Sequence, residues 1–132
     1  MSDRQPDQLQ VIHAPDDCKN APRKLVIRDF VVALYQRDTE TLSAMLREDI
    51  RWEIVGSETF DDLEQVLGWI QQQAGVDELH IATVLTHGTD CAADGWIIGA
   101  DGNTIRFCHI LVFAGHAKSA KIKALRTYRI ST

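Results

Sequence analysis

Apolar residues recur at helical spacing early in the chain and at strand spacing later. Between residues 22 and 37 they fall three and four positions apart, which predicts an amphipathic helix. Pro22 suits its first turn, because proline lacks a backbone N–H that would go unused there. Asp38 predicts the cap of a short second helix, and Asp61 with Glu64 predicts the start of a third. Three helices are therefore expected before the main run of strands.

One strand is predicted at residues 50–55, between the second and third helices. After Gly75 the pattern becomes entirely that of strands, which are predicted at residues 79–86, 91–98, 104–113 and 121–130. Short turns between successive strands favour antiparallel pairing, since parallel neighbours need long crossovers. The expected fold is an α+β domain of order α-α-β-α-β-β-β-β, with a curved antiparallel sheet and three helices packed on one face.

The first 21 residues are predicted to be a flexible polar lead, followed by one domain over residues 22–132. Pro6, Pro15 and Pro22 are the only prolines, so the domain has none after its first residue. No apolar run reaches the roughly 18 residues of a membrane span, and the lead lacks the apolar segment of a signal peptide. We therefore expect a cytoplasmic protein without a membrane partner.

Charge is unevenly distributed, although the net charge is only -5. All 19 acidic residues lie at or before Asp101, whereas the charged residues of segment 103–132 are all Lys or Arg. The acidic protein as a whole would be repelled by phosphates, so no nucleic-acid partner is expected. Cys18, Cys91 and Cys108 are widely separated, and the histidines lack the spacing of metal ligands. We predict neither a metal nor another cofactor.

Three segments of the chain together resemble a known family. They read VIRDFVVALYQRD on the first helix, IRWEIVGSETF on the first strand, and HILVFAG followed by KIKALRTY near the end. Their order and spacing resemble the nuclear transport factor 2-like superfamily, which includes ketosteroid isomerases and SnoaL-like cyclases. The resemblance covers about residues 22–131. It implies a cone-shaped curved antiparallel sheet with three helices on its concave side around a small-molecule pocket, and a homodimer formed through the outer sheet face.

The resemblance also implies candidate catalytic positions. Glu53 stands where ketosteroid isomerases have their catalytic Asp base, ahead of a matching V-G-S-E segment. His109 stands at the position of the protonated Asp that stabilises the oxyanion, and Phe30 at that of the oxyanion-binding Tyr. Because Phe30 has no hydroxyl, steroid isomerase activity itself is not expected.

Taken from the residues alone, the two candidate catalytic residues each have two interpretations. Glu53 shares a strand face with Arg51 and Val55, so it is either a desolvated pocket base or part of a solvated face. His109 lies in an apolar stripe that includes Phe107. It is either a core histidine satisfied by a hydrogen bond or a proton carrier in a pocket.

The last predicted strand supplies two more candidates, Arg126 and Tyr128, which strict alternation places on one face with Ile122 and Ile130. Both would reach the cavity or a dimer interface, where Arg126 would hold an anionic group or form a salt bridge. Trp52 is either a packing or interface residue or part of a ligand cage. The candidates are therefore Glu53 and His109 for catalysis, with Phe30, Trp52, Phe107, Arg126 and Tyr128 for substrate binding.

Three functions fit these expectations. The first is a cofactor-free isomerase, cyclase or dehydratase, with Glu53 as base and His109 as acid or oxyanion donor. The second is a non-catalytic domain that binds or carries a small apolar molecule, and the third is a dimerising interaction module. The sequence does not decide whether the protein is an enzyme. The foremost expectation is an internal pocket that binds an unidentified small apolar molecule. Catalysis of a proton transfer in this pocket is a further possibility.

Overall fold

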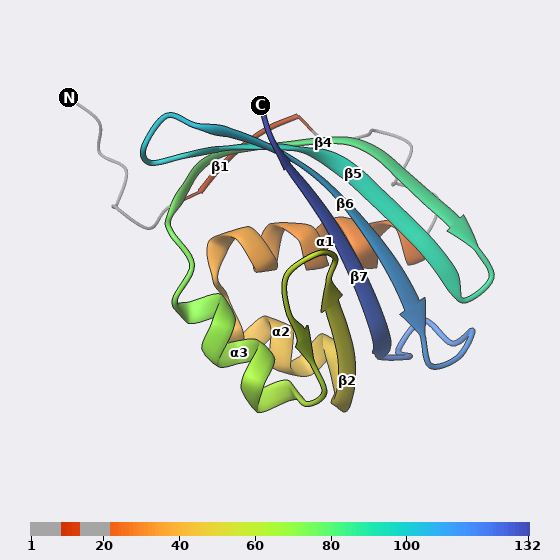
Figure 1. The fold of residues 1–132 in the computed structure, drawn as a ribbon. Helices are drawn as coiled ribbons and strands as arrows, with labels where there is room; N and C mark the ends of the chain where they lie inside the picture. Colours follow the sequence, from red (N-terminus) through yellow and green to blue (C-terminus); the bar gives the residue numbers. More distant parts are fainter. Residues whose placement is uncertain (1–8, 14–21) are drawn as a thin grey trace.

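The computed structural model describes residues 9–13 and 22–132, where three helices pack on the concave side of one strongly curved sheet (Figure 1). The helices are α1 (Pro22–Gln36), α2 (Thr39–Met45) and α3 (Leu63–Gln71). The strands are β1 (Gln10–His13), β2 (Leu46–Ile54), β3 (Thr59–Phe60), β4 (Val76–His87), β5 (Asp90–Gly99), β6 (Thr104–Phe113) and β7 (Ile122–Ser131). The predicted α+β class is confirmed.

The N-terminal lead contributes a strand that the polar sequence pattern did not predict. β1 pairs in parallel with β4, with Val11 opposite Leu79. Leu9, just before β1, is buried, whereas residues 1–8 and 14–21, including Cys18, lie outside the described residues. Part of the segment that was predicted to be a flexible lead is therefore paired to the edge of the sheet.

Two acidic side chains cap helices at their N-termini. The Asp38 carboxylate accepts a hydrogen bond from the Thr41 amide at 3.1 Å, as predicted. α3 is capped by Asp62, whose carboxylate accepts from the Gln65 amide at 2.8 Å, and not by Asp61 as the sequence spacing suggested. Either of two adjacent aspartates satisfies the capping pattern, and backbone geometry selects the second.

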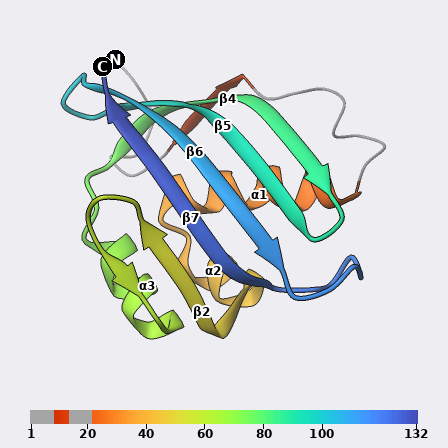
Figure 2. The ribbon, with the colours of Figure 1, turned by 45° about the vertical axis from the view of Figure 1, so that its right-hand side comes forward.

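The sheet has the strand order β1-β4-β5-β6-β7-β2-β3 (Figure 2). The predicted antiparallel pairing holds for β4 through β7. The sheet as a whole is mixed, because β2 lies parallel to β7 and β1 lies parallel to β4. α3 and the strands β3 to β6 provide the long connection that the parallel β2–β7 pair requires.

A β-bulge bends β4 across the helices. Ala82 is an extra residue, since Ile81 pairs with Gly95 whereas Thr83 pairs with the next residue, Asp94. At this point the backbones approach so closely that a Cβ on Gly95 would overlap the carbonyl oxygen of His80. The absence of a side chain at Gly95 therefore permits the bend that wraps the sheet.

A second extra residue, Lys123, interrupts the alternation of β7. Phe113 pairs with Ile122, whereas Val112 pairs with Ala124, so Lys123 adds one position to β7 that β6 lacks. Because side chains alternate with a period of two, this addition turns the rest of the strand by one position. Residues after the bulge consequently face the side opposite to that predicted by strict alternation.

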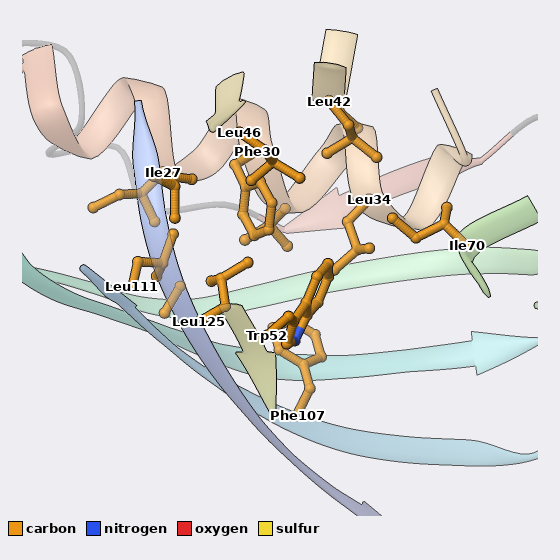
Figure 3. Close-up of a cluster of buried hydrophobic side chains, with 14 of the residues drawn as sticks. Ile27, Phe30, Leu34, Leu42, Leu46, Trp52, Ile70, Phe107, Leu111 and Leu125 are labelled. Atoms are coloured by element: carbon orange, nitrogen blue, oxygen red, sulfur yellow. The ribbon is translucent and has the colours of Figure 1, made fainter. Parts of the chain in front are cut away.

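The core fills the space between the helices and the concave face of the sheet (Figure 3). α1 contributes Phe30 and Leu34, β2 contributes Trp52, and β6 contributes Phe107 and Leu111, all of them buried. None of the helices in the described ranges is long and apolar enough to cross a membrane. The buried side chains of the helices pack against the concave face of the sheet.

Candidate functional site

A cavity of about 450 Å³ opens between the C-terminal ends of α1 and α3 and the concave face of the sheet. Much of its wall is apolar, formed by Leu34, Trp52, Trp69, Ile70, Ile97 and Ile105. This volume lies within the range of small-molecule pockets, which combine apolar walls with a few polar groups. Its polar groups therefore decide what chemistry the cavity can perform.

A continuous chain of hydrogen bonds lies in the wall of this cavity. The Trp52 indole N–H donates to Thr127 Oγ1 at 2.8 Å, and Thr127 Oγ1 lies 2.8 Å from His109 Nδ1. The other ring nitrogen, His109 Nε2, lies 3.0 Å from the Tyr35 hydroxyl. Four side chains from β2, β7, β6 and α1 thus share one network, and all four line the cavity.

Burial keeps the two titratable members of this network neutral. Desolvation, helped by the nearby positive charge of Arg129, lowers the pKa of His109 to about 3. Burial also raises the pKa of Tyr35 above its usual value, although Arg129 acts in the opposite direction. His109 is therefore a neutral imidazole and Tyr35 an intact phenol near neutral pH. Such a pair suits hydrogen bonding to a ligand better than it suits carrying protons.

Of the residues predicted for the site, His109 and Trp52 line the cavity. Phe30 and Phe107 are buried and pack against the imidazole of His109, at centroid distances of 6.2 and 5.0 Å. These two phenylalanines therefore exclude water from His109 and support its orientation, rather than forming the cavity surface.

Glu53 lies outside the cavity, on the convex face of the sheet. Trp52 and Ile54 point inward from β2, so the period of two directs Glu53 outward, where it is exposed. Its Cα partner on β7 is Arg126, another exposed residue. The solvated interpretation of Glu53 is the one that the structure supports, and a role as pocket base has no geometric support.

Arg126 and Tyr128 also lie on the convex face, contrary to the expectation that they reach the cavity. Tyr128 is 42% exposed and Arg126 is exposed beside it. The extra residue Lys123 is the physical reason, because it reverses which residues of β7 face inward. Thr127 and Arg129 line the cavity instead.

Most residues of the cavity were absent from the sequence-derived candidates, among them Tyr35, Thr127 and Arg129. Tyr35 belongs to the apolar stripe of α1, and this pattern predicts packing rather than a polar role. Arg129 has the same parity as Lys121 and Lys123, which predicted an exposed position. Only the hydroxyl of Tyr35, alone in an otherwise apolar helix stripe, gave a signal in the sequence.

Arg129 lies between this cavity and a neighbouring one of about 320 Å³, and it lines both. Its guanidinium lies 5.8 Å from the ring centre of Trp69. Glu58 lines the smaller cavity and Asp101 the larger. Within residues 9–13 and 22–132, no group of three or more His, Cys, Asp or Glu side chains could hold a metal ion.

No protein family model matches the chain, and no curated protein matches it either. Solved structures do match. A proposed ketosteroid isomerase from Kribbella flavida is 18% identical with a TM-score of 0.70, covering 84% of this chain and 79% of that protein. An NTF2-like protein of unknown function from Mesorhizobium loti is 16% identical with a TM-score of 0.67, covering 90% and 99%.

An LEH-like epoxide hydrolase from M. tuberculosis is 19% identical with a TM-score of 0.62, covering 83% of each chain. At such identities the similarity concerns the fold, and one fold carries many activities. The resemblance found in the sequence segments is confirmed at this level: the chain has the fold of the nuclear transport factor 2-like superfamily.

Proposed function

We propose that this protein binds a small molecule with an apolar body and one oxygen atom that accepts a hydrogen bond. The observation that carries this proposal is that Tyr35, which bears a hydroxyl, lines a largely apolar cavity of about 450 Å³. An apolar ligand body would replace water along the walls, and the hydroxyl would fix its orientation. His109 Nε2 lies 3.0 Å from the Tyr35 hydroxyl and holds it in position.

Arg129 adds a positive charge to the same cavity. It makes no ion pair with another of the residues that the structure describes, so its charge is available to a ligand. A guanidinium beside a hydroxyl favours an oxygen with negative or partly negative charge, such as that of a carboxylate or a ketone. This charge argues against cationic ligands.

The proposal is tested by titrating 2-naphthoate and 1-tetralone into the protein and following amide chemical shifts. We expect Tyr35→Phe and Arg129→Gln each to weaken 2-naphthoate binding by about tenfold, the loss typical of one charged hydrogen bond. Glu53→Gln is the matched control, because it alters an exposed carboxylate on the other face and should change nothing. Absence of shifts in the cavity, or an equal loss in the control, would contradict the proposal.

A second candidate function is enzymatic proton transfer. The observation that favours it is Asp101, a carboxylate that lines the cavity and accepts hydrogen bonds from Asn103 at 2.9 and 3.0 Å. Asp101 would remove a proton next to a carbonyl while Tyr35 donates a hydrogen bond to the carbonyl oxygen. Solved neighbours of the same fold are named as a proposed ketosteroid isomerase and an LEH-like epoxide hydrolase, which supports this second candidate.

Hydrogen–deuterium exchange next to the carbonyl of 1-tetralone in D₂O separates binding from catalysis. An enzyme would accelerate exchange, and Asp101→Asn would abolish the acceleration. Asp94→Asn is the control, because Asp94 is exposed on β5. A rate no faster than that of buffer alone would leave the binding function and remove the enzymatic one.

We also propose that the protein forms a homodimer through the convex face of the sheet. Large apolar side chains are exposed on its strands, with Ile130 at 65%, Leu85 at 59% and Tyr128 at 42%. Burying such side chains between two copies would remove apolar surface from water.

A further inference from the structure

We propose that Thr127 fixes neutral His109 in the tautomer protonated at Nε2, so that the Tyr35 hydroxyl keeps its own proton free for a ligand oxygen. This inference rests on the proposed function of the cavity as a ligand site. Thr127 is a positioning residue in this account, since it acts through His109 and Tyr35. The inference follows from counting the hydrogens available along the chain of four side chains.

The four hydrogen-bonded side chains carry one more polar hydrogen than they have hydrogen-bond contacts with one another. Trp52 can only donate, and Thr127, neutral His109 and Tyr35 each carry one polar hydrogen. Four hydrogens thus serve three contacts, so one hydrogen is left over. The direction of the bonds decides whether the spare hydrogen belongs to Tyr35 or to Thr127.

In one arrangement the bonds all run the same way, from Trp52 to Thr127 to His109 to Tyr35. The Thr127 hydroxyl then donates to Nδ1, Nε2–H donates to the tyrosine oxygen, and the spare hydrogen is that of Tyr35. Tyr35 is only partly buried and lines the cavity, where water or a ligand can accept its hydrogen. Every buried donor is satisfied in this arrangement.

In the other arrangement, Tyr35 donates to Nε2 and Nδ1–H donates to Thr127. The spare hydrogen is then that of the Thr127 hydroxyl, which already accepts from Trp52. Thr127 also lines the cavity, but unlike the half-buried Tyr35 it is only 2% exposed, and within the described part of the chain its hydroxyl has no other hydrogen-bond partner. A buried donor without an acceptor is costly, so the first arrangement is favoured.

A neutral imidazole is required for either arrangement, because imidazolium would donate from both nitrogens. The surroundings of His109 meet this requirement: Phe30 and Phe107 pack against its ring, and the positive charge of Arg129 lies nearby. Burial and Arg129 lower the pKa of His109 to about 3, which keeps the ring neutral at pH 7.

The arrangement defines the chemical class of ligand. Tyr35 and Arg129 would both offer hydrogens to the ligand, so the polar end of the cavity acts as a pair of donors. The matching group is an oxygen that carries no hydrogen, as in a ketone, an ester or a carboxylate. Ammonium groups lack an acceptor and would also be repelled by Arg129.

The direction in which the hydrogen bonds run through His109 can be measured without any ligand. Two-bond ¹H–¹⁵N correlations from the ring protons of a histidine distinguish the two tautomers. His109 can be recognised because, with a pKa of about 3, it does not titrate between pH 5 and pH 8. We expect Nε2 protonated and Nδ1 unprotonated at pH 7. A ring protonated at Nδ1, or an equal mixture of tautomers, would overturn the inference.

A ligand pair then tests the consequence for recognition. 1-Tetralone carries an acceptor oxygen, and tetralin has the same ring system without it. We expect Thr127→Val to weaken 1-tetralone about tenfold and tetralin less than about twofold, while Thr127→Ser, which keeps the hydroxyl, preserves both affinities. Equal losses for the two ligands in Thr127→Val would contradict the positioning role.

The two experiments also distinguish failure of this inference from failure of the proposed function. If neither compound nor 2-naphthoate binds the wild-type protein, the proposed function is wrong, and the tautomer of His109 still decides the direction of the chain. If the ligands bind and His109 is protonated at Nδ1, the proposed function survives and this inference fails. The tautomer is measured on the wild-type chain, so the result does not depend on a variant that folds.

Discussion

The concave and convex faces of β2 and β7 differ in almost every property, although they are made by alternate residues of the same strands. Trp52 and Thr127 are buried and joined by a hydrogen bond, whereas their chain neighbours Glu53 and Arg126 are exposed. Glu53 is chemically the more attractive catalytic residue, yet it points away from the cavity. The comparison teaches that the face on which a side chain lies outweighs its intrinsic reactivity.

The largest contrast between the faces is expected in packing. Trp52→Ala should lower the free energy of unfolding by about 3–5 kcal/mol, because it removes a fully buried ring that contacts Phe30 and Trp69. Its neighbour Glu53→Ala should change stability by less than about 0.5 kcal/mol. Urea denaturation of both variants measures the difference, and similar losses would show that the faces are not energetically distinct.

The second contrast concerns acid. Folded His109 has a pKa of about 3, whereas an unfolded histidine has about 6.5, so the unfolded state binds the proton first. Stability conferred by this neutral ring is present above about pH 6.5 and is lost as pH falls toward 3. The expected loss is at most about 1.4 kcal/mol per pH unit, or about 3 kcal/mol by pH 4.

Denaturation curves at pH 7, 5.5 and 4 measure this slope. His109→Gln should flatten it, because glutamine does not titrate. His87→Gln is the control, because His87 is exposed and lies outside the hydrogen-bond network of His109. A slope that persists in His109→Gln would assign acid sensitivity to other groups.

A smaller effect is expected from the hydrogen-bond chain. Thr127→Val keeps the shape of the side chain but leaves the Trp52 N–H and His109 Nδ1 without their partner, so stability should fall by about 1–3 kcal/mol. Arg126→Ala, one residue away on the convex face, should cost less than about 0.5 kcal/mol. The comparison would break if the arginine variant lost as much stability as the valine variant.

The smallest effect on folding, with the largest on assembly, is expected for Ile130→Lys. Ile130 is exposed, so its replacement should alter the unfolding free energy of one chain by less than about 0.5 kcal/mol. It should nevertheless dissociate the proposed homodimer by placing charges in an apolar interface. Sedimentation equilibrium measures this, with Thr41→Lys on α2 as control. A wild-type protein that is monomeric at all concentrations would contradict the dimer.

β6 shows how far simple alternation can predict a structure. Its odd-numbered residues, including Phe107, His109 and Leu111, were predicted to share one face, and all three are buried. β6 pairs with β5 without a register shift, so the period of two is never interrupted. Alternation also predicted which residues of β7 face the concave side. That prediction is wrong after Lys123, because this extra residue interrupts the period of two.

The network around His109 could not be predicted for a different reason. Tyr35 and His109 are 74 positions apart, and Trp52 and Thr127 are 75 apart. Periodicity shows which side of an element is apolar, but it does not show which two elements face each other. The family resemblance placed His109 in a pocket, and only the packing of α1 against the sheet brings the Tyr35 hydroxyl to its ring.

Lys123 makes the cavity unusually sensitive to small changes in the gene. Loss of its single codon would restore strict alternation in β7, exchanging the residues presented to the two sides of the sheet. The cavity would then receive Arg126 and Tyr128 in place of Thr127 and Arg129. A single in-frame deletion would therefore exchange several cavity-lining side chains at once, whereas a single substitution changes only one.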